Sequence, residues 1–274
     1  MFISETDRTF PGSTLIVAFS GWVDAAGVGT GVAEHLAMGG DLVGHLDPDE
    51  IFDYRVNRPS VDFIDGKLQS VEYPEVTVRS VTFGDASLLV MTGTEPEFRW
   101  QGLGRAMVDL TNAWGVAELV CVGSVPAAVA HTRPTNVLST STTADFSAMG
   151  ERVPEGLLRV PGAAVTSIEW HLAQAGMPTY GFWAQVPHYV GDRFKQGVVA
   201  LVERVARHLD VEVPLRGLLE EAIEQRDRLD RLVAANPEVS EFLNQLESLV
   251  DPDDLPSAEE IATEIEDFLK GTGE

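Results

Sequence analysis

Four separate segments of this chain share one pattern, an apolar run of strand length that stops at a short polar motif. The runs are Leu15–Ser20, Leu88–Thr92, Leu119–Gly123 and Gly181–Val186. Unbroken apolar runs of this length are typical of strands that a parallel sheet buries on both faces. In such a sheet the carboxyl ends of the strands lie along one edge, and ligands bind in the crevice there. We therefore expect four motifs that are distant in the sequence to meet at one edge of a sheet.

Helical patterns separate these runs. The predicted helices cover Ala25–Met38, Arg99–Trp114, Val165–Ala175 and Phe194–Leu209. The second helix carries apolar residues at helical spacing and lies between two of the apolar runs. Because a strand–helix–strand order implies a right-handed parallel crossover, the pattern predicts an α/β fold.

Two further strands are expected next to each other. Leu68–Tyr73 and Val76–Phe83 alternate between apolar and polar residues, as half-buried strands do. Only Pro74 and Glu75 separate them, so we expect the two to pair as a hairpin or at the edge of the sheet. Leu42–Leu46 predicts a weaker strand.

A change of character near Val211–Pro214 predicts a boundary between an α/β core domain, residues 1–212, and an acidic helical C-terminal extension, residues 213–274. From Leu215 onward the chain has 17 acidic and 5 basic residues, which accounts for half of the formal net charge of −24. The extension should contain three helices, over Leu215–Ala234, Pro237–Val250 and Ala258–Lys270.

Each of these acidic helices carries an apolar stripe that must be buried, because isolated helices of this length are marginal in water. The stripes pack either on the core domain or on another subunit or partner. We expect a homo-oligomer in which the extension, or the adjoining helix Phe194–Leu209, contributes contacts.

The composition excludes several classes of protein. A net charge of −24 repels phosphate backbones, which disfavours nucleic acid as a partner. No stretch reaches the roughly 18 apolar residues of a membrane span, and the first residues do not form a basic, apolar signal peptide. Cys121 is the only cysteine, so no intrachain disulfide can form, which fits a reducing compartment. We therefore expect a cytoplasmic protein without a membrane partner, in which Cys121 is a buried packing residue rather than a catalytic thiol.

The sequence predicts no cofactor and no metal. Gly27, Gly29 and Gly31 follow a strand, but their spacing and their place inside the predicted helix do not fit a dinucleotide-binding turn. Close packing of the helix on the sheet explains them better. Ser124 lacks the glycine pattern of a nucleophile elbow. His35, His45, His171 and His208 lack partners at ligand spacing.

The candidate ligand-binding residues lie in the motifs that follow the strands. They are Trp22, Asp24, Glu95, His131, Arg133, His188 and Tyr189. Arg133 suits bidentate binding of a carboxylate or phosphate, and the imidazole of His131 or His188 can donate to an anion or act as an acid or base. No residue is an evident nucleophile, so no catalytic residue is assigned. We expect Asp24, Glu95, His131 and His188 to line one cleft; the alternative is a structural network in which Arg133 pairs with Glu95 or Asp24 and locks the loops.

Five segments resemble, in the same order, the signature motifs of the proteasome assembly chaperone family, in its chaperone-two branch. They are Gly21–Ala25, Phe52–Arg55 with Arg58 and Pro59, Thr92–Pro96 with Trp100, His131–Pro134 and Val186–Tyr189. The match spans roughly residues 10 to 210. The helical tail is similar to that of the bacterial, especially actinobacterial, members.

The resemblance implies a three-layer α/β/α sandwich similar in shape to nucleoside phosphorylases and related hydrolases, here with a C-terminal helical appendage. Eukaryotic and archaeal relatives help to assemble the proteasome core particle, and some carry a C-terminal hydrophobic–tyrosine–any motif that docks into the proteasome ring. Residues Gly271–Glu274 do not match that motif, which argues against docking by a tail peptide.

The leading interpretation is a non-enzymatic cytoplasmic protein that binds other proteins, with proteasome subunits as candidate partners. The alternative is a protein that binds a small anionic or nucleoside-like ligand, or a phosphorylase- or hydrolase-like enzyme, that uses the carboxyl ends of the strands. The resemblance and the missing nucleophile favour the first interpretation. The dense polar motifs at one edge of the sheet favour the second, since a scaffold needs few such loops.

Overall fold

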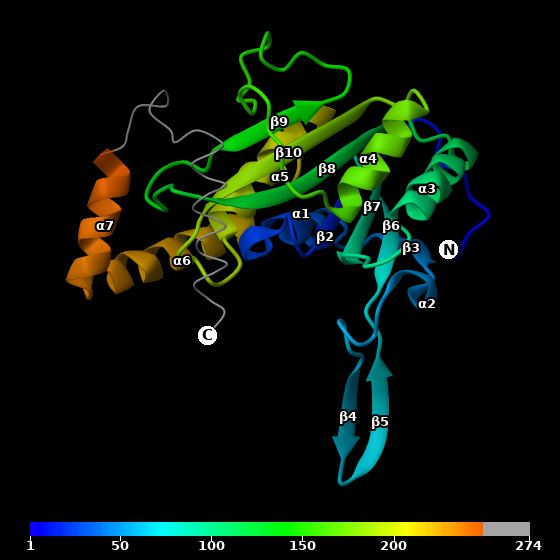
Figure 1. Cartoon of the computed structure of the whole chain (residues 1–274), viewed down its shortest axis with the longest axis horizontal. Coiled ribbons are helices and arrows are strands. Elements are labelled where there is room, and N and C mark those ends of the chain that lie inside the picture. The colour runs from blue at the N-terminus through cyan, green and yellow to red at the C-terminus, as the bar shows by residue number, and fades with distance from the viewer. Residues whose placement is uncertain (249–274) are drawn as a thin grey trace.

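A computed structural model describes residues 1–248 and contains one large mixed sheet (Figure 1). Its strands, in spatial order, are β1 (Phe2–Ser4), β3 (Asp41–Leu46), β6 (Val76–Phe83), β7 (Ala86–Thr94), β2 (Thr14–Ser20), β8 (Glu118–Ala127), β10 (Thr179–Pro187) and β9 (Val137–Ser141). The four central strands β7, β2, β8 and β10 are mutually parallel, and the outer ones pair antiparallel. These four are the apolar runs of the sequence, so their predicted placement in one sheet is confirmed.

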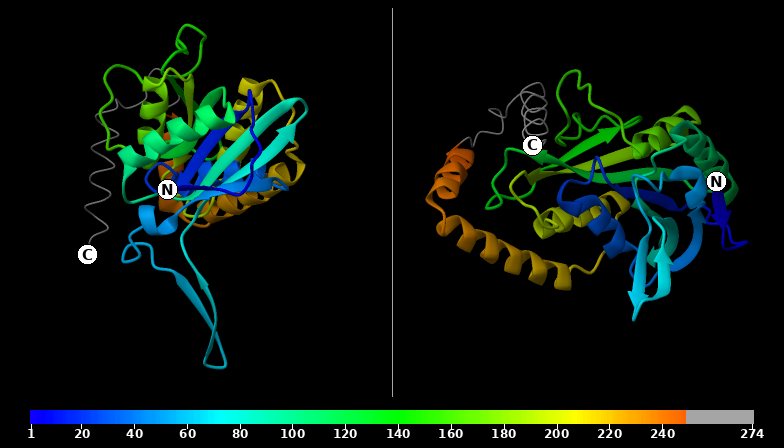
Figure 2. Two further views of the ribbon diagram at one scale, coloured as in Figure 1. Left: turned by 90° about the vertical axis from the view of Figure 1, so that its right-hand side faces the viewer. Right: turned by 60° about the horizontal axis from the view of Figure 1, so that its bottom comes forward.

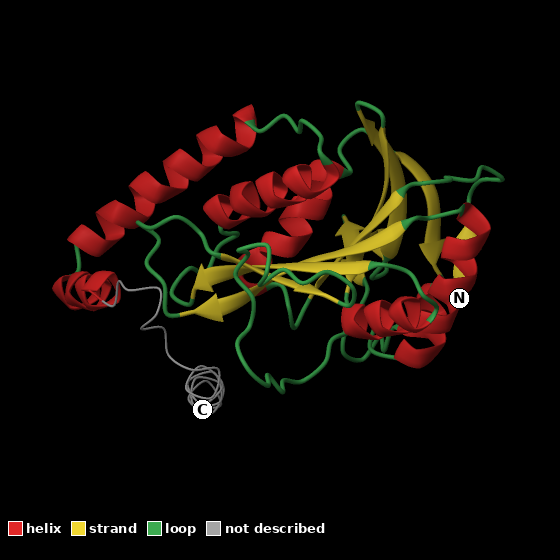
Figure 3. Cartoon of the chain, turned by 90° about the horizontal axis from the view of Figure 1, so that it is seen from above, coloured by secondary structure: helices red, strands yellow, loops and turns green. Residues whose placement is uncertain are grey.

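Helices cover both faces of the sheet, which confirms the three-layer α/β/α architecture (Figure 3). One face carries α3 (Trp100–Trp114) and α4 (Ala164–Gln174), with the short α2 (Pro48–Ile51) near its edge. The other carries α1 (Val28–Leu36) and α5 (Lys195–Leu209). The C-terminal α6 (Arg216–Ala234) lies on α5, and α7 (Pro237–Ser248) follows it.

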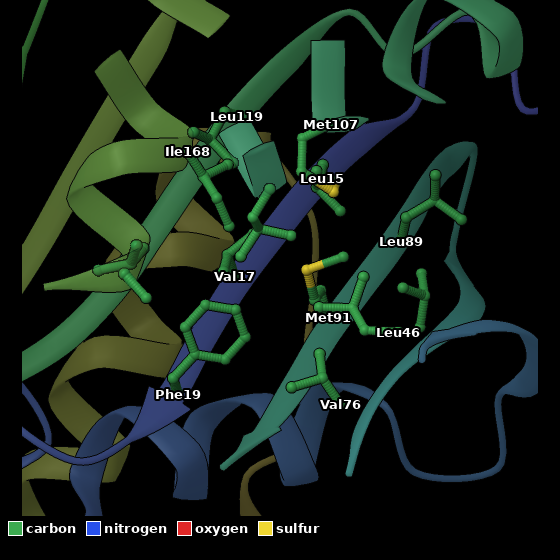
Figure 4. Packing of buried hydrophobic residues seen from close by; sticks show 14 of the residues in the cluster. Leu15, Val17, Phe19, Leu46, Val76, Leu89, Met91, Met107, Leu119 and Ile168 are labelled. Carbon is green, nitrogen blue, oxygen red and sulfur yellow. The ribbon is translucent and has the colours of Figure 1, made fainter. Parts of the chain in front are cut away.

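Strand β2 shows why the central runs are apolar throughout. Leu15, Val17 and Phe19 point into the cluster beneath α3 and α4, as Figure 4 shows. Ile16 and Ala18 point into the opposite cluster beneath α1 and α5. Both sets are buried, and each large apolar side chain buried contributes roughly 1.5–3 kcal/mol.

The glycines of α1 allow the helix to approach the sheet closely. A β-carbon at Gly29 would lie 2.9 Å from Cα of Gly123, and one at Gly31 would lie 2.9 Å from a methyl group of Val198. This confirms packing as the reason for these glycines. The helix predicted from Ala25 breaks at Ala26, which has a φ of 48°, so Ala25–Gly27 form a separate 3-10 turn (η1) and α1 begins at Val28.

The predicted pairing of Leu68–Tyr73 with Val76–Phe83 is wrong. The first segment forms β5 (Lys67–Glu72), which pairs antiparallel with β4 (Ser60–Ile64) in a separate two-stranded sheet. Asp65 and Gly66, with φ of 48° and 74°, form the tight turn, as expected for an Asp-Gly hairpin. We call this hairpin, residues 60–72, the arm; it projects away from the rest of the chain (Figures 1 and 2).

The first two helices of the predicted extension are present as α6 and α7. Leu218, Ala222 and Leu229 of α6 pack into the cluster that α5 forms with the sheet. The third predicted helix, Ala258–Lys270, lies outside the described residues. No helix within residues 1–248 is long and apolar enough to cross a membrane.

Candidate functional site

The structure brings the four strand-end motifs to one edge of the sheet but ties their polar side chains into separate local networks. Arg133 pairs with neither Asp24 nor Glu95, so the expected locking network is wrong in its partners. Asp24, Glu95, His131 and His188, which were expected to line one cleft, each contact different partners.

Glu95, just past β7, fastens two neighbouring elements to each other. One carboxylate oxygen accepts a hydrogen bond from the backbone N–H of Trp22 at 3.1 Å, and the other accepts from the N–H of Ala164 at 2.8 Å. Ala164 is the first residue of α4, where a negative charge also favours the helix dipole. The carboxylate therefore fixes the loop after β2 against the start of α4.

Glu97 performs the same task two residues further on. Its carboxylate accepts from the backbone N–H of Asp53 at 2.9 Å and from the side-chain amide of Asn57. Glu97 therefore holds the loop that leads into the arm. The sequence analysis missed Glu97 because it considered only residues directly after the strands; a second glutamate at the next alternate position was the available signal.

Asp24 caps α1. Its carboxylate accepts from the backbone N–H of Thr30 at 3.2 Å and from the Thr30 hydroxyl at 2.6 Å. Burial raises the pKa of Asp24 above its ordinary value, against the opposing effect of these hydrogen bonds. The Ser124 hydroxyl, within β8, donates to the carbonyl of Ala25 at 2.8 Å and fixes the same turn.

His131 and Tyr189 come together beneath α6. His131 is buried, its Nδ1 lies 2.8 Å from the Tyr189 hydroxyl, and its Nε2 lies 3.2 Å from Asp230 of α6. The hydroxyl also accepts from the His131 backbone N–H at 2.8 Å. The Tyr189 hydroxyl therefore contacts both the backbone and the ring of His131, and Nε2 links that ring to Asp230. Burial raises the pKa of Tyr189.

The remaining motif residues contact α7. Thr132 donates to the carboxylate of Glu247, and the Arg133 guanidinium lies 3.5 Å from the Glu247 carbonyl. The exposed His188 ring packs edge-on against Phe242, with centroids 5.4 Å apart. The sequence analysis left open whether the C-terminal stripes pack in cis; within residues 1–248, α6 and α7 pack on the strand-end loops of their own chain.

Gln225 makes a contact between helices that the sequence analysis did not predict. This buried residue of α6 accepts from the backbone N–H of Lys195 at 2.8 Å and donates to the carbonyl of Arg193 at 2.8 Å. A lone glutamine on a charged helix carries no signature for such a contact. Gln225 thus fixes α6 to the start of α5.

We expect Gln225→Ala to loosen α6. The substitution leaves a backbone donor and a backbone acceptor without partners, at a cost of about 1–3 kcal/mol. Hydrogen exchange should quicken along α6 while the protection of β2 is kept. Gln174→Ala, at an exposed helix end, is the matched control and should change neither. Unchanged exchange in α6 would contradict the assigned role.

Cys121 is fully buried, and burial raises the pKa of its thiol well above the usual value, so it is a packing residue as expected. In the part of the chain that the structure describes, no three His, Cys, Asp or Glu side chains group as metal ligands.

Trp22 stays 48% exposed, with its backbone held by Glu95.

Comparison with known protein families places the chain. The model of the PAC2 family matches residues 18–233, which is most of the sequence and includes all five motifs. The chain belongs to the PAC2 family. The resemblance to the proteasome assembly chaperone family, in its chaperone-two branch, is thereby confirmed. No curated protein matches the sequence.

Several solved structures share the fold. A Corynebacterium glutamicum protein of unknown function matches with a TM-score of 0.83 and 28% identity, over 90% of this chain and 95% of that one. A Mycobacterium tuberculosis proteasome-assembly chaperone homologue matches with a TM-score of 0.77 and 28% identity, over 84% and 99%. An archaeal proteasome activator from Pyrococcus furiosus, with a TM-score of 0.68 and 16% identity over 85% and 98%, shows the same fold.

In this PAC2 family member the polar motifs therefore have a clear physical task. Glu95, Glu97 and Asp24 accept backbone N–H groups of loops and helix starts, and His131 joins β8 to α6. These contacts join the strand-end loops to neighbouring helices.

Proposed function

We propose that the chain is a non-enzymatic, cytoplasmic protein-binding protein with a chaperone-like role, and that proteasome subunits are its partners. Membership of the PAC2 family and similarity to a proteasome-assembly chaperone homologue support this role. The small-ligand or enzymatic alternative is not favoured, because the polar residues on which it rested are bonded to the protein's own backbone and helices.

The arm is the observation that carries the proposal. Phe63, Ile64 and Leu68 near its tip are 60%, 62% and 56% exposed, and Phe63 lies opposite Leu68 in the hairpin. Val61 and Val71 form a second exposed cross-strand pair. Contiguous exposed apolar surface on a soluble chain marks a protein contact, and a two-stranded hairpin alone is marginal in water.

Homo-oligomerisation is part of the proposal. The apolar side of helix α5 is used within the chain: Val198, Leu201 and Val205 are buried against the sheet. The arm is therefore a better candidate than α5 for a contact between copies, and it is the candidate for a contact with a partner.

We expect F63S/I64S to weaken partner binding while leaving the fold intact. Both side chains are largely exposed, so the free energy of unfolding should change by less than about 1 kcal/mol. Loss of two apolar side chains central to an interface should weaken binding at least about tenfold. Sedimentation velocity with and without purified proteasome subunits from the same organism measures self-association and partner binding together.

The control for this experiment is L157S/I223S, which removes two apolar side chains that are also exposed but lie outside the arm. It should bind as the native protein does. If F63S/I64S retains native binding, the arm is not the contact surface. If native protein binds no proteasome subunit but self-associates through the arm, the proposed partner is wrong and the arm is an oligomer contact.

A further inference from the structure

A groove lined by residues of α3 and α4 has no part in the contacts described so far. It lies beside the start of α3, and its volume is about 650 Å³. The lining residues are Met1, Arg99, Trp100, Gln101, Gly102, Arg105 and Ser167. A volume of this size is ordinary for small-molecule sites, which run from roughly 300 to 1,000 Å³.

Trp100, which lines the groove, is held in place by one hydrogen bond of its side chain and one of its backbone. The indole N–H of Trp100 donates to the carbonyl of Pro96, and the carbonyl of Trp100 accepts from the Ser167 hydroxyl at 2.9 Å. The half-buried indole therefore offers a fixed apolar surface. A ligand that packs on it does not have to order it first, which favours affinity.

Two arginines, Arg99 and Arg105, also line the groove. Arg105 makes no ion pair or hydrogen bond within residues 1–248, although the chain has 43 acidic residues and only 19 lysines and arginines. Arg99 lies 3.5 Å from Glu50, which also pairs with the N-terminal amine at 3.1 Å. The Glu50 carboxylate thus pairs with two cations, and Arg105 has no acidic partner within residues 1–248.

We propose that this groove binds a carboxylate whose apolar body lies on Trp100. A free guanidinium holds a carboxylate with two parallel hydrogen bonds, and an adjacent indole suits an apolar or aromatic body. The net charge of −24 and the nearby Glu50 oppose a dianion more strongly than a monoanion, which favours a carboxylate over a phosphate.

This proposal goes beyond protein binding by the arm. The carboxylate has two possible sources of the same chemistry, a free small acid or the C-terminus of a peptide. Both present one planar anion on an apolar body, and the open groove admits either. Length of the ligand separates the two sources, since a peptide makes contacts beyond the carboxylate.

The test uses the full chain and two pairs of probes, N-acetylphenylalanine and acetyl-Ala-Ala-Phe, each as the free acid and as the amide. We expect the acids to shift the NMR signals of the Trp100 indole and the Gly102 amide saturably, and the amides to bind at least about tenfold more weakly. A tripeptide acid that binds at least tenfold better than the single residue identifies a chain terminus as the ligand. Equal binding of the two acids identifies a free small acid.

Substitution separates the site from general charge effects. R105Q should weaken acid binding at least about tenfold, the loss expected when a charge-assisted bidentate contact is removed. R216Q removes the same charge from an exposed residue of α6 and should leave binding within twofold of native. Absence of a saturable shift with either acid, or equal binding by R105Q, would overturn the proposal. F63S/I64S should bind the acids normally, so the outcome is independent of the function proposed for the arm.

Discussion

Replacing Gly93 with alanine is expected to destabilise the protein by about 4 kcal/mol or more, a large fraction of a typical free energy of unfolding. A β-carbon at this position would overlap the carbonyl oxygen of Glu75 and lie 2.8 Å from Cα of Val76. Gly93 also has a φ of 153°, a backbone conformation that favours glycine. Relaxation is restricted, because Val76 pairs with Gly93 in the sheet and Thr94 donates to the Glu75 carbonyl at 3.0 Å.

Denaturant unfolding followed by circular dichroism measures this effect. Gly162→Ala is the control, since a β-carbon there meets nothing within 4 Å and the residue has no positive φ. It should change the free energy of unfolding by no more than about 0.5 kcal/mol. A G93A protein within 1 kcal/mol of native stability would mean that β6 and β7 separate more easily than their register suggests.

The central strands could be predicted from the sequence because their environment imposes one simple pattern. A strand covered by helices on both faces has apolar residues at successive positions, so the run Leu15–Ser20 differs from β2 by a single residue. Helix α3 could be predicted equally well, because only one of its sides is buried and its apolar residues recur at helical spacing.

The arm could not be predicted from periodicity. β5 alternates like a half-buried strand at the edge of a sheet, yet Leu68 and Val71 are both exposed. Alternation follows from burial of one face only if that face is covered within the same chain. The local signal that remained was the Asp65-Gly66 pair, whose turn chemistry specifies a hairpin closed at that point.

The candidate site shows a different limit. Sequence placed Glu95 and His131 correctly at strand ends, because that depends only on where an apolar run stops. Their partners are backbone groups and C-terminal helices. The N–H groups that donate to Glu95 belong to Trp22 and Ala164, which lie 73 and 69 positions away in the sequence. A backbone N–H is the same in every residue, so no residue type announces such a contact.

Glu95→Gln is therefore expected to destabilise the protein by about 2–3 kcal/mol, although it keeps the size and shape of the side chain. A glutamine has one acceptor oxygen, and its amide nitrogen would face either the N–H of Trp22 or that of Ala164, donor against donor. Loss of the charge also removes its favourable interaction with the start of α4.

Two measurements distinguish this role from that of a ligand-binding carboxylate. Hydrogen exchange at Trp22 and Ala164 should quicken in the variant, and the free energy of unfolding should fall without any ligand present. Glu75→Gln, an exposed carboxylate nearby with no side-chain partner within residues 1–248, removes the same charge and should stay within about 0.5 kcal/mol of native. If E95Q is as stable as E75Q, then Glu95 does not fasten the edge, and its carboxylate is again available for a ligand. If it is destabilised as expected, the polar motif after β7 serves to hold the loop after β2 against the start of α4.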